Sequence, residues 1–521
     1  MAKSTDQDKK VLHNLGYAQE LSRRMSGFSN FAISFSIICI LAGGISSFPA
    51  AFNSTGGGGA FIGWLVGGFF SLMVALSMGQ IASAYPTAGG LYHWASILAG
   101  KFWGWFAAWF NLLGLLFVVA SVDVFLYVVF FKDLLLGATL GIDTSSFTIW
   151  HQHAFVIVAL VTQGLLNHYG IGITTKVTDL SGYLILALTV IFIIALFAFS
   201  PVALDFSRLV TFSNLTGVDG PGGGVIPIVA PSTFAAFFFG LIYVMYTITG
   251  FDASGHTSEE THDAQVNVPK GMWTSVFYSW IFGLVMVAAF VLTMPSIEEG
   301  AAAGFGSFFY MWSASLMPAW LKIALAVGFV IVNYICALAG LTSTSRMMFA
   351  FARDGGLPAS KLLSHVSTQY RTPTYAIWTG VVLAFITTLT GIIGVALGLQ
   401  GVDIFLVLAT GCAVFLYISY AIPVIAGFFA EGKTWTTKGP FNLGGLSKPI
   451  ALISGLGVLL LSTTGFFPPN VPVFYLTIGM IIILPILWVA GINKTFEGVP
   501  TGDKIRERQK MIAEIEAKYK D

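Results

Sequence analysis

The stretch FSNFAISFSIICILAGGISSFPAA, residues 28–51, contains no charged side chain over its whole length. A helix of this length rises by about 1.5 Å per residue and is long enough to cross a hydrocarbon core roughly 30 Å thick. The sequence therefore predicts that the chain enters a membrane here as a helix.

The composition of the rest of the chain supports the same interpretation. Apolar residues make up 56% of the 521 residues and charged residues only 9%, whereas soluble domains carry about 25% charged residues. The apolar blocks are continuous and do not alternate in polarity, which favours helices over strands. The net charge of +1 suggests no nucleic-acid partner. We expect an all-α integral membrane protein.

Blocks of this kind recur along the chain and predict twelve spans. Their expected ranges are 28–51, 60–84, 104–130, 154–169, 177–199, 233–255, 272–294, 320–351, 374–397, 402–428, 449–467 and 471–491. Placing the N-terminus in the cytoplasm puts 22 of the 25 lysines and arginines on the cytoplasmic side. Because cytoplasmic loops are enriched in these residues, both termini are predicted to be cytoplasmic and the protein to lie in the cell membrane.

The first span contains the sequence Ala42-Gly43-Gly44-Ile45-Ser46. Two adjacent glycines cost a helix about 1 kcal/mol each relative to alanine. The sequence is consistent with a break that exposes backbone N–H groups to a ligand carboxylate. A close helix contact through small residues is an equally open alternative.

The sixth span contains Gly250, Phe251 and Asp252 within an apolar block. An acid inside a membrane segment is costly to bury unpaired and favours a functional role. Interrupted helices at matching positions of two halves, here spans one and six, indicate the central site of a transporter.

Four motifs in order make the chain similar to the amino acid–polyamine–organocation superfamily, and most similar to its amino acid/choline branch. They are LGYAQELSRRM (15–25), YPTAGGLY (85–92), TGFD with SEET (249–252 and 258–261), and SR with FARDGGLP (345–346 and 351–358). The resemblance implies two inverted five-helix repeats, about 28–199 and 233–428, inside a core of 28–428. Peripheral helices at 449–491 and tails at 1–27 and 492–521 complete the expected organisation.

The resemblance also implies a substrate site between the two breaks, with Phe251 as a lid. The substrate carboxylate would meet N–H groups around Gly43–Ser46, and the amine would lie near the carbonyls of Ile248–Phe251. Asn333 is either a substrate contact or a hydrogen-bonding group between helices. The predicted substrate-binding residues are Ala42, Gly43, Gly44, Ile45, Ser46, Tyr246, Ile248, Thr249, Gly250, Phe251, Asp252 and Asn333.

The coupling ion, H⁺ or Na⁺, is left open by the sequence. Some members of the superfamily carry a lysine in the fifth helix, but the matching position here is Ile185, which argues against that form of proton coupling. Asp252 is one ion-coupling candidate. Thr342 and Ser345 are candidates for sodium, although such hydroxyls often bond only to their own helix.

These observations predict a secondary active transporter for a small amino acid or γ-aminobutyrate, working by alternating access. A choline or polyamine permease and a transport-inactive nutrient sensor are the alternatives. The sequence contains no nucleophile–base pair in a catalytic context, so an enzyme is not expected. No cofactor or metal is expected either. The expected partners are a small-molecule substrate and the lipid bilayer, with monomer or dimer left open.

Overall fold

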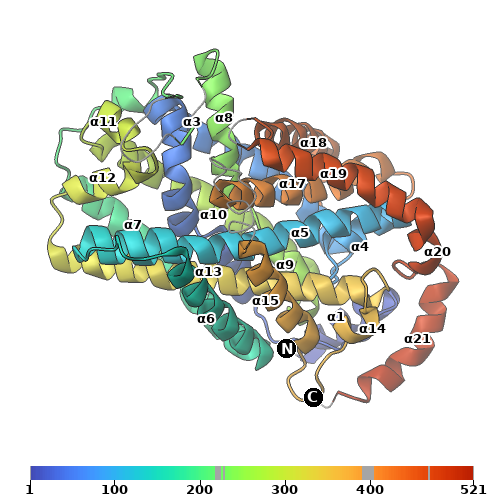
Figure 1. Cartoon of the computed structure of the whole chain (residues 1–521). Coiled ribbons are helices and arrows are strands. Elements are labelled where there is room, and N and C mark those ends of the chain that lie inside the picture. The colour runs from blue at the N-terminus through green and yellow to red at the C-terminus, as the bar shows by residue number, and fades with distance from the viewer. Residues whose placement is uncertain (1, 218–224, 227–228, 390–403, 468–469, 520–521) are drawn as a thin grey trace.

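The chain folds almost entirely as helices (Figure 1). The computed structural model describes residues 2–217, 225–226, 229–389, 404–467 and 470–519. Within these ranges the only extended pairings are two isolated bridges, Met25–Thr261 and Glu431–Trp435. The all-helical prediction is confirmed, while the ends of two predicted spans, 390–397 and 402–403, lie outside the described residues.

Nine helical segments of the described chain are long and apolar enough to cross a membrane. They are α2–α3 (Gly27–Ile38 and Ile40–Ala84), α5 with η1 (Lys101–Phe125 and Leu126–Thr139), α6 (Ile149–His168), α7 (Ile171–Ala198), α10 (Ala264–Thr293), α13 (Ala319–Arg353), α17 (Ile404–Ala430), α18 (Ser447–Thr464) and α19 (Val471–Leu487). Two shorter apolar helices are α8 (Thr233–Thr247) and α15 (Thr374–Thr388). The twelve-span count stays a prediction.

The first two predicted spans are joined more tightly than expected. The sequence predicts a connection over 52–59, but α3 stays helical except at Thr55 and Gly56. Gly56 has φ 72°, a left-handed conformation that glycine adopts without strain. The chain therefore changes direction over two residues.

Apolar side chains are exposed on the outside of the bundle. Ile194 of α7, Leu456 of α18 and Ile486 of α19 are each about 60% exposed. A soluble protein rarely exposes contiguous apolar surface of this kind, whereas a bilayer requires it.

Both chain ends lie at the same end of the bundle (Figure 1). There α1 (Ala2–Asn14) contacts α21 (Asp503–Glu516), and His13 Nε2 lies 2.7 Å from Glu516 Oε1. We call this the terminal end. The distal end carries the short helices α11 (Ile297–Ala302) and α12 (Ser307–Ala314), beside the bend of α3.

The interior is organised around α3, which packs against α8 and α10. The broken helix α2–α3 also contacts α7 and α13, and α5 packs against α13 and α17. These helices surround the site.

Candidate functional site

The break in the first span lies at Cys39, and the predicted break at Gly43–Gly44 is wrong. Helix α2 ends at Ile38 and α3 begins at Ile40, with Cys39 between them at φ 32° and ψ 76°. The first bond within α3 runs from Gly43 N to Cys39 O. The N–H groups that a helix start leaves unbonded therefore belong to Ile40–Ala42.

Gly43 instead allows α3 to approach the end of α8. A Cβ atom on Gly43 would lie 2.7 Å from Thr247 Cγ2, and the hydroxyls of Ser47 and Thr247 are 2.9 Å apart. This is the small-residue helix contact that the sequence left as an alternative.

The break in the sixth span is confirmed. Helix α8 ends at Thr247, and the short helix α9 (Ala253–His256) begins after five non-helical residues. Gly250 has φ 83°, and a Cβ atom there would lie 2.3 Å from Ile37 Cγ2. Only glycine fits this position without strain, and the two broken helices touch here.

Protein side chains already bind the backbone of the second break. Tyr417 donates to Ile248 O at 2.8 Å, and Ser34 donates to Phe251 O at 2.9 Å. Gly250 N donates to the Tyr420 hydroxyl at 3.1 Å. The carbonyls of Ile248 and Phe251, expected to face a substrate amine, therefore hold the break in its shape.

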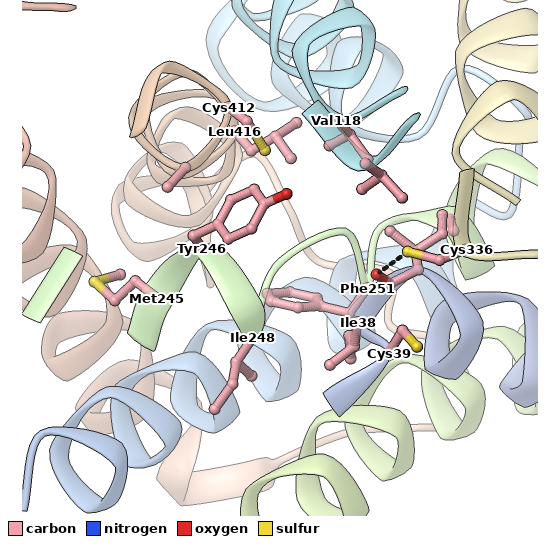
Figure 2. Packing of buried hydrophobic residues seen from close by; sticks show 14 of the residues in the cluster. Ile38, Cys39, Val118, Met245, Tyr246, Ile248, Phe251, Cys336, Cys412 and Leu416 are labelled. Carbon is pink, nitrogen blue, oxygen red and sulfur yellow. Dashed lines mark hydrogen bonds between the residues drawn. The ribbon is translucent and has the colours of Figure 1, made fainter. Parts of the chain in front are cut away.

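A small cavity lies between the two breaks. Its volume of about 20 Å³ has room for roughly one water molecule, so the helices are nearly closed around it. Tyr246, Val118 and Cys412 converge on it from α8, α5 and α17 (Figure 2). The lining residues are Ile37, Ile38, Ala42, Gly43, Ser46, Val118, Val122, Phe125, Tyr246, Thr247, Thr249, Asn333, Cys336 and Cys412.

Half of the predicted substrate residues line this central cavity. These are Ala42, Gly43, Ser46, Tyr246, Thr249 and Asn333, whereas Gly44, Ile45, Ile248, Gly250, Phe251 and Asp252 do not line it. Phe251 instead packs against Tyr420, with ring centroids 5.0 Å apart.

The sequence did not predict the apolar residues and the cysteines that line one side of the cavity. Val118, Val122 and Phe125 recur at helical spacing along α5 and so share one face. Their spacing was visible, but a uniformly apolar helix gives no sign of which face points inward. Cys336 and Cys412 also line the cavity.

Asp252 forms the centre of a buried polar cluster beside the cavity. Its side chain is 1% exposed and accepts hydrogen bonds from Tyr420 at 2.8 Å and Asn111 at 2.9 Å. His256 Nε2 lies 3.2 Å from the same carboxylate. Tyr420 and His256 were not singled out from the sequence, although the spacing of four from Asp252 to His256 places both on one helical face.

Both ring nitrogens of His256 face acceptors. Nδ1 lies 3.1 Å from Ala88 O, and Nε2 faces Asp252. A neutral imidazole has only one N–H, so it cannot donate to both. The tautomer of the ring therefore decides which of these two contacts is a hydrogen bond.

The hydroxyls considered for sodium bond away from the first break. Thr342 donates to Asn167 Oδ1 at 2.8 Å, and Ser345 donates to Thr342 O. At the break, Cys336 Sγ donates to Ile37 O at 3.1 Å (Figure 2). Asn333 donates to Val122 O at 3.1 Å, the interhelical bond left open by the sequence.

A second cavity of about 270 Å³ lies on the distal side and shares the lining residue Ser46 with the first. Ile45 and Pro49 of α3 line it together with Phe308 of α12 and Asp133 of η1. Ser46 therefore lies between the two cavities.

The terminal side is closed by buried ion pairs. Arg346 binds Glu260 through two hydrogen bonds of 2.9 and 3.0 Å, and both side chains are fully buried. Arg353 binds Glu259 in the same way, at 2.8 and 3.0 Å.

We call the Arg346–Glu260 and Arg353–Glu259 pairs, with the backbone groups bonded to them, the terminal closure. All four sequence motifs contribute residues to it. Ala88 N donates to Glu259 Oε1, and Met25 N donates to Glu260 O. The closure therefore joins segments that are far apart in the chain.

Two broken helices around a small buried cavity are the arrangement expected of a membrane transporter. A family model described as amino acid permease matches residues 25–491. The chain therefore belongs to the amino acid permease family, and the predicted resemblance is confirmed. It is a multi-pass membrane transporter and not an enzyme.

Individual relatives agree with this assignment. The amino-acid permease BAT1 of Arabidopsis thaliana is 31% identical over 513 residues, which cover 94% of this chain and 95% of that protein. Its rice homologue is 29% identical over 511 residues, covering 94% of each chain. The GABA-specific permease of Saccharomyces cerevisiae is 28% identical over 468 residues, covering 88% and 78%.

Proposed function

We propose that this permease is a secondary active transporter for a small zwitterionic amino acid, working by alternating access. The observation that carries the proposal is the position of the central cavity. It shares the lining residue Ser46 with the distal cavity, and the buried Arg346–Glu260 pair lies on its terminal side. With both termini in the cytoplasm, this arrangement corresponds to a state closed on the inside.

The inverted-repeat organisation is part of this proposal. Breaks at Cys39 and at 248–252 fall in the first helix of each predicted half. Such breaks let two halves rock about a fixed site at the membrane midplane.

The lining of the central cavity favours a substrate without net charge. None of its lining residues is an acid or a base. Polyamines carry several positive charges that this lining would leave unpaired, at a high cost in a low-dielectric interior. A zwitterion needs only oriented dipoles, which argues for an amino acid over choline or putrescine. The similarity to a GABA-specific permease makes γ-aminobutyrate the first substrate to test.

We assign the substrate carboxylate to the start of α3, where the N–H groups of Ile40–Ala42 and the helix dipole favour negative charge. Thr249 is the proposed contact for the amine. Its hydroxyl is buried without hydrogen-bond geometry to a partner in the described residues and lies beside Tyr420. The cavity must widen to admit such a ligand.

Proton coupling through Asp252 and His256 is favoured over sodium coupling. The two side chains lie 3.2 Å apart next to the cavity, so a change in their surroundings on opening can make the pair bind or release a proton. At the first break, the side chain facing Ile37 O is the thiol of Cys336. A thiol is a soft ligand, whereas a hard cation such as Na⁺ prefers oxygen.

Uptake into proteoliposomes tests the proposal. The labelled panel contains γ-aminobutyrate, neutral, acidic and basic amino acids, choline and putrescine, with proton or sodium gradients imposed separately. We expect accumulation of a zwitterion driven by the proton gradient. Accumulation of putrescine or choline alone, or driven by sodium alone, would contradict it. Ligand-induced thermal stabilisation without any uptake would support a sensor.

A further inference from the structure

A large pocket with a positively charged lining opens at the terminal end, separate from the transport site. Its volume is about 640 Å³, far larger than the central cavity. It lies between the N-terminal segment, the α6–α7 connection, the segment before α10 and the loop before α15. We call it the basic pocket.

The ionisable side chains of the basic pocket are mostly cationic. They include Lys9, Arg23, Arg24, Lys176 and Arg371, together with His262, and no aspartate or glutamate lines the pocket in the described residues. Asp8 lies beside the pocket, with its Oδ2 3.8 Å from Arg23 Nη1. Such a single-sign lining focuses a positive potential in the pocket.

The start of α7 adds to this potential. Gly170–Ile173 line the pocket, and Gly170, at φ 122°, precedes the 28-residue helix without a side-chain cap. The first N–H groups of a helix and its dipole favour an anion. Arg24 reaches the same point, because its Nη1 lies 3.8 Å from the Cβ position of Gly172.

Two of the cations are available to a ligand. Arg24 Nε donates only to the neutral hydroxyl of Ser22, and Lys176 has no hydrogen bond or ion pair within the described chain. By contrast, Arg23 is engaged, since it donates to Gln19 Oε1 and to the carbonyls of Ser258 and Thr261. Arg24 and Lys176 are therefore the side chains with which a test can begin.

The pocket lies against the outer surface of the bundle. Tyr169 and Ile173, which line it, are 53% and 44% exposed. Tyrosine beside apolar side chains and lysines is typical of headgroup depth in a bilayer. With cytoplasmic termini, the pocket would face the leaflet that is rich in anionic lipid.

We propose that the basic pocket binds a phosphate-bearing anion, supplied by the headgroup of an anionic lipid. Lys9, Arg24 and the start of α7 hold the phosphate, and Lys176 approaches it from the first turns of α7. Because the pocket joins the N-terminal segment to the loop before α15, a bound phosphate links these parts at the terminal end. This proposal does not depend on the substrate or on the coupling ion.

Thermal unfolding of the full-length protein in detergent tests the proposal. Dihexanoyl phosphatidylglycerol, dihexanoyl phosphatidylcholine and inorganic phosphate are titrated separately. We expect a saturable rise in the unfolding temperature with phosphatidylglycerol and none with phosphatidylcholine. The same rise with inorganic phosphate would support the pocket but assign it to a soluble anion. No response to either anion would overturn the proposal.

Charge-matched variants separate the pocket from general surface charge. The double variant Arg24→Gln/Lys176→Gln should lose most of the response, and Lys176→Gln alone should raise the half-saturating concentration severalfold. The control Lys361→Gln/Lys510→Gln removes the same charge from exposed residues outside the pocket and should respond like the wild type. An unchanged response in the first variant, or an equal loss in the control, would overturn the proposal.

Discussion

His256 Nε2 lies 3.2 Å from Asp252 Oδ2, in a pair that is almost completely buried. The opposite ring nitrogen faces the carbonyl of Ala88, which belongs to the YPTAGGLY segment beside the terminal closure. The pair therefore connects the neighbourhood of the cavity to the terminal closure. In the proposed alternating-access cycle, a proton bound by this pair would respond to opening at the terminal end.

Replacing Asp252 with asparagine should uncouple transport from the proton gradient. The amide keeps the size of the side chain but cannot share a proton with His256. In proteoliposomes, Asp252→Asn should equilibrate substrate without accumulating it, and exchange of internal for external substrate should continue. Asp133→Asn, which removes an acid from the distal cavity, is the matched control and should still accumulate substrate. Gradient-driven accumulation by Asp252→Asn would place the coupling elsewhere.

Gly43 and Gly44 should respond differently to alanine. A Cβ atom on Gly43 would meet the branched side chain of Thr247 at 2.7 Å, whereas one on Gly44 would meet only the flexible tip of Met286 at 2.5 Å. Gly43→Ala should lower stability by about 1–3 kcal/mol, the usual cost of overpacking, and reduce uptake. Gly44→Ala should stay near the wild type in thermal unfolding and uptake. Equal behaviour of the two variants would argue against the close contact of α3 with α8.

The Thr249 hydroxyl should contribute to substrate affinity. Thr249→Val removes the hydroxyl while nearly keeping the shape, and should raise the KM for uptake about tenfold, as expected for a hydrogen bond worth about 1.4 kcal/mol. Thr249→Ser keeps the hydroxyl and should stay within about twofold of the wild type, an effect of less than about 0.5 kcal/mol. If the KM rises in Thr249→Ser, which loses the methyl group, and stays unchanged in Thr249→Val, Thr249 has a packing role.

Breaking the Arg346–Glu260 pair should open the terminal side. Glu260→Gln leaves the buried Arg346 charge without its carboxylate, which favours conformations that admit water. The rate at which a membrane-impermeant maleimide added from that side labels Cys412 should therefore rise, as measured by mass spectrometry. Glu431 pairs with Lys438 at 2.9 Å and does not line the cavity, so Glu431→Gln should leave the labelling rate unchanged. Labelling that is insensitive to Glu260→Gln would mean that another layer closes this side.

The helical membrane fold and the family followed from the sequence, because length, hydropathy and contiguous motifs are local properties. The break in the sixth span was also predictable, since an acid beside glycine within an apolar block is costly in an unbroken helix that faces lipid. The motifs were recognised one by one. Only the structure showed that Met25, Ala88, Glu259 and Arg346 contribute to one closure.

The sequence by itself determined which segments are helical and that the sixth span is interrupted beside Gly250 and Asp252. The tertiary structure decided the first break, because Cys39 carries no signal for a left-handed conformation and Gly43 suits a helix contact as well as a break. It also decided which face of α5 lines the cavity and which cations surround the basic pocket. Lys9, Arg24 and Lys176 are distant in the chain, and only the folding of their segments against one another brings their charges together. Local preferences determine conformation along the chain, whereas sites depend on which side chains the folded bundle places side by side.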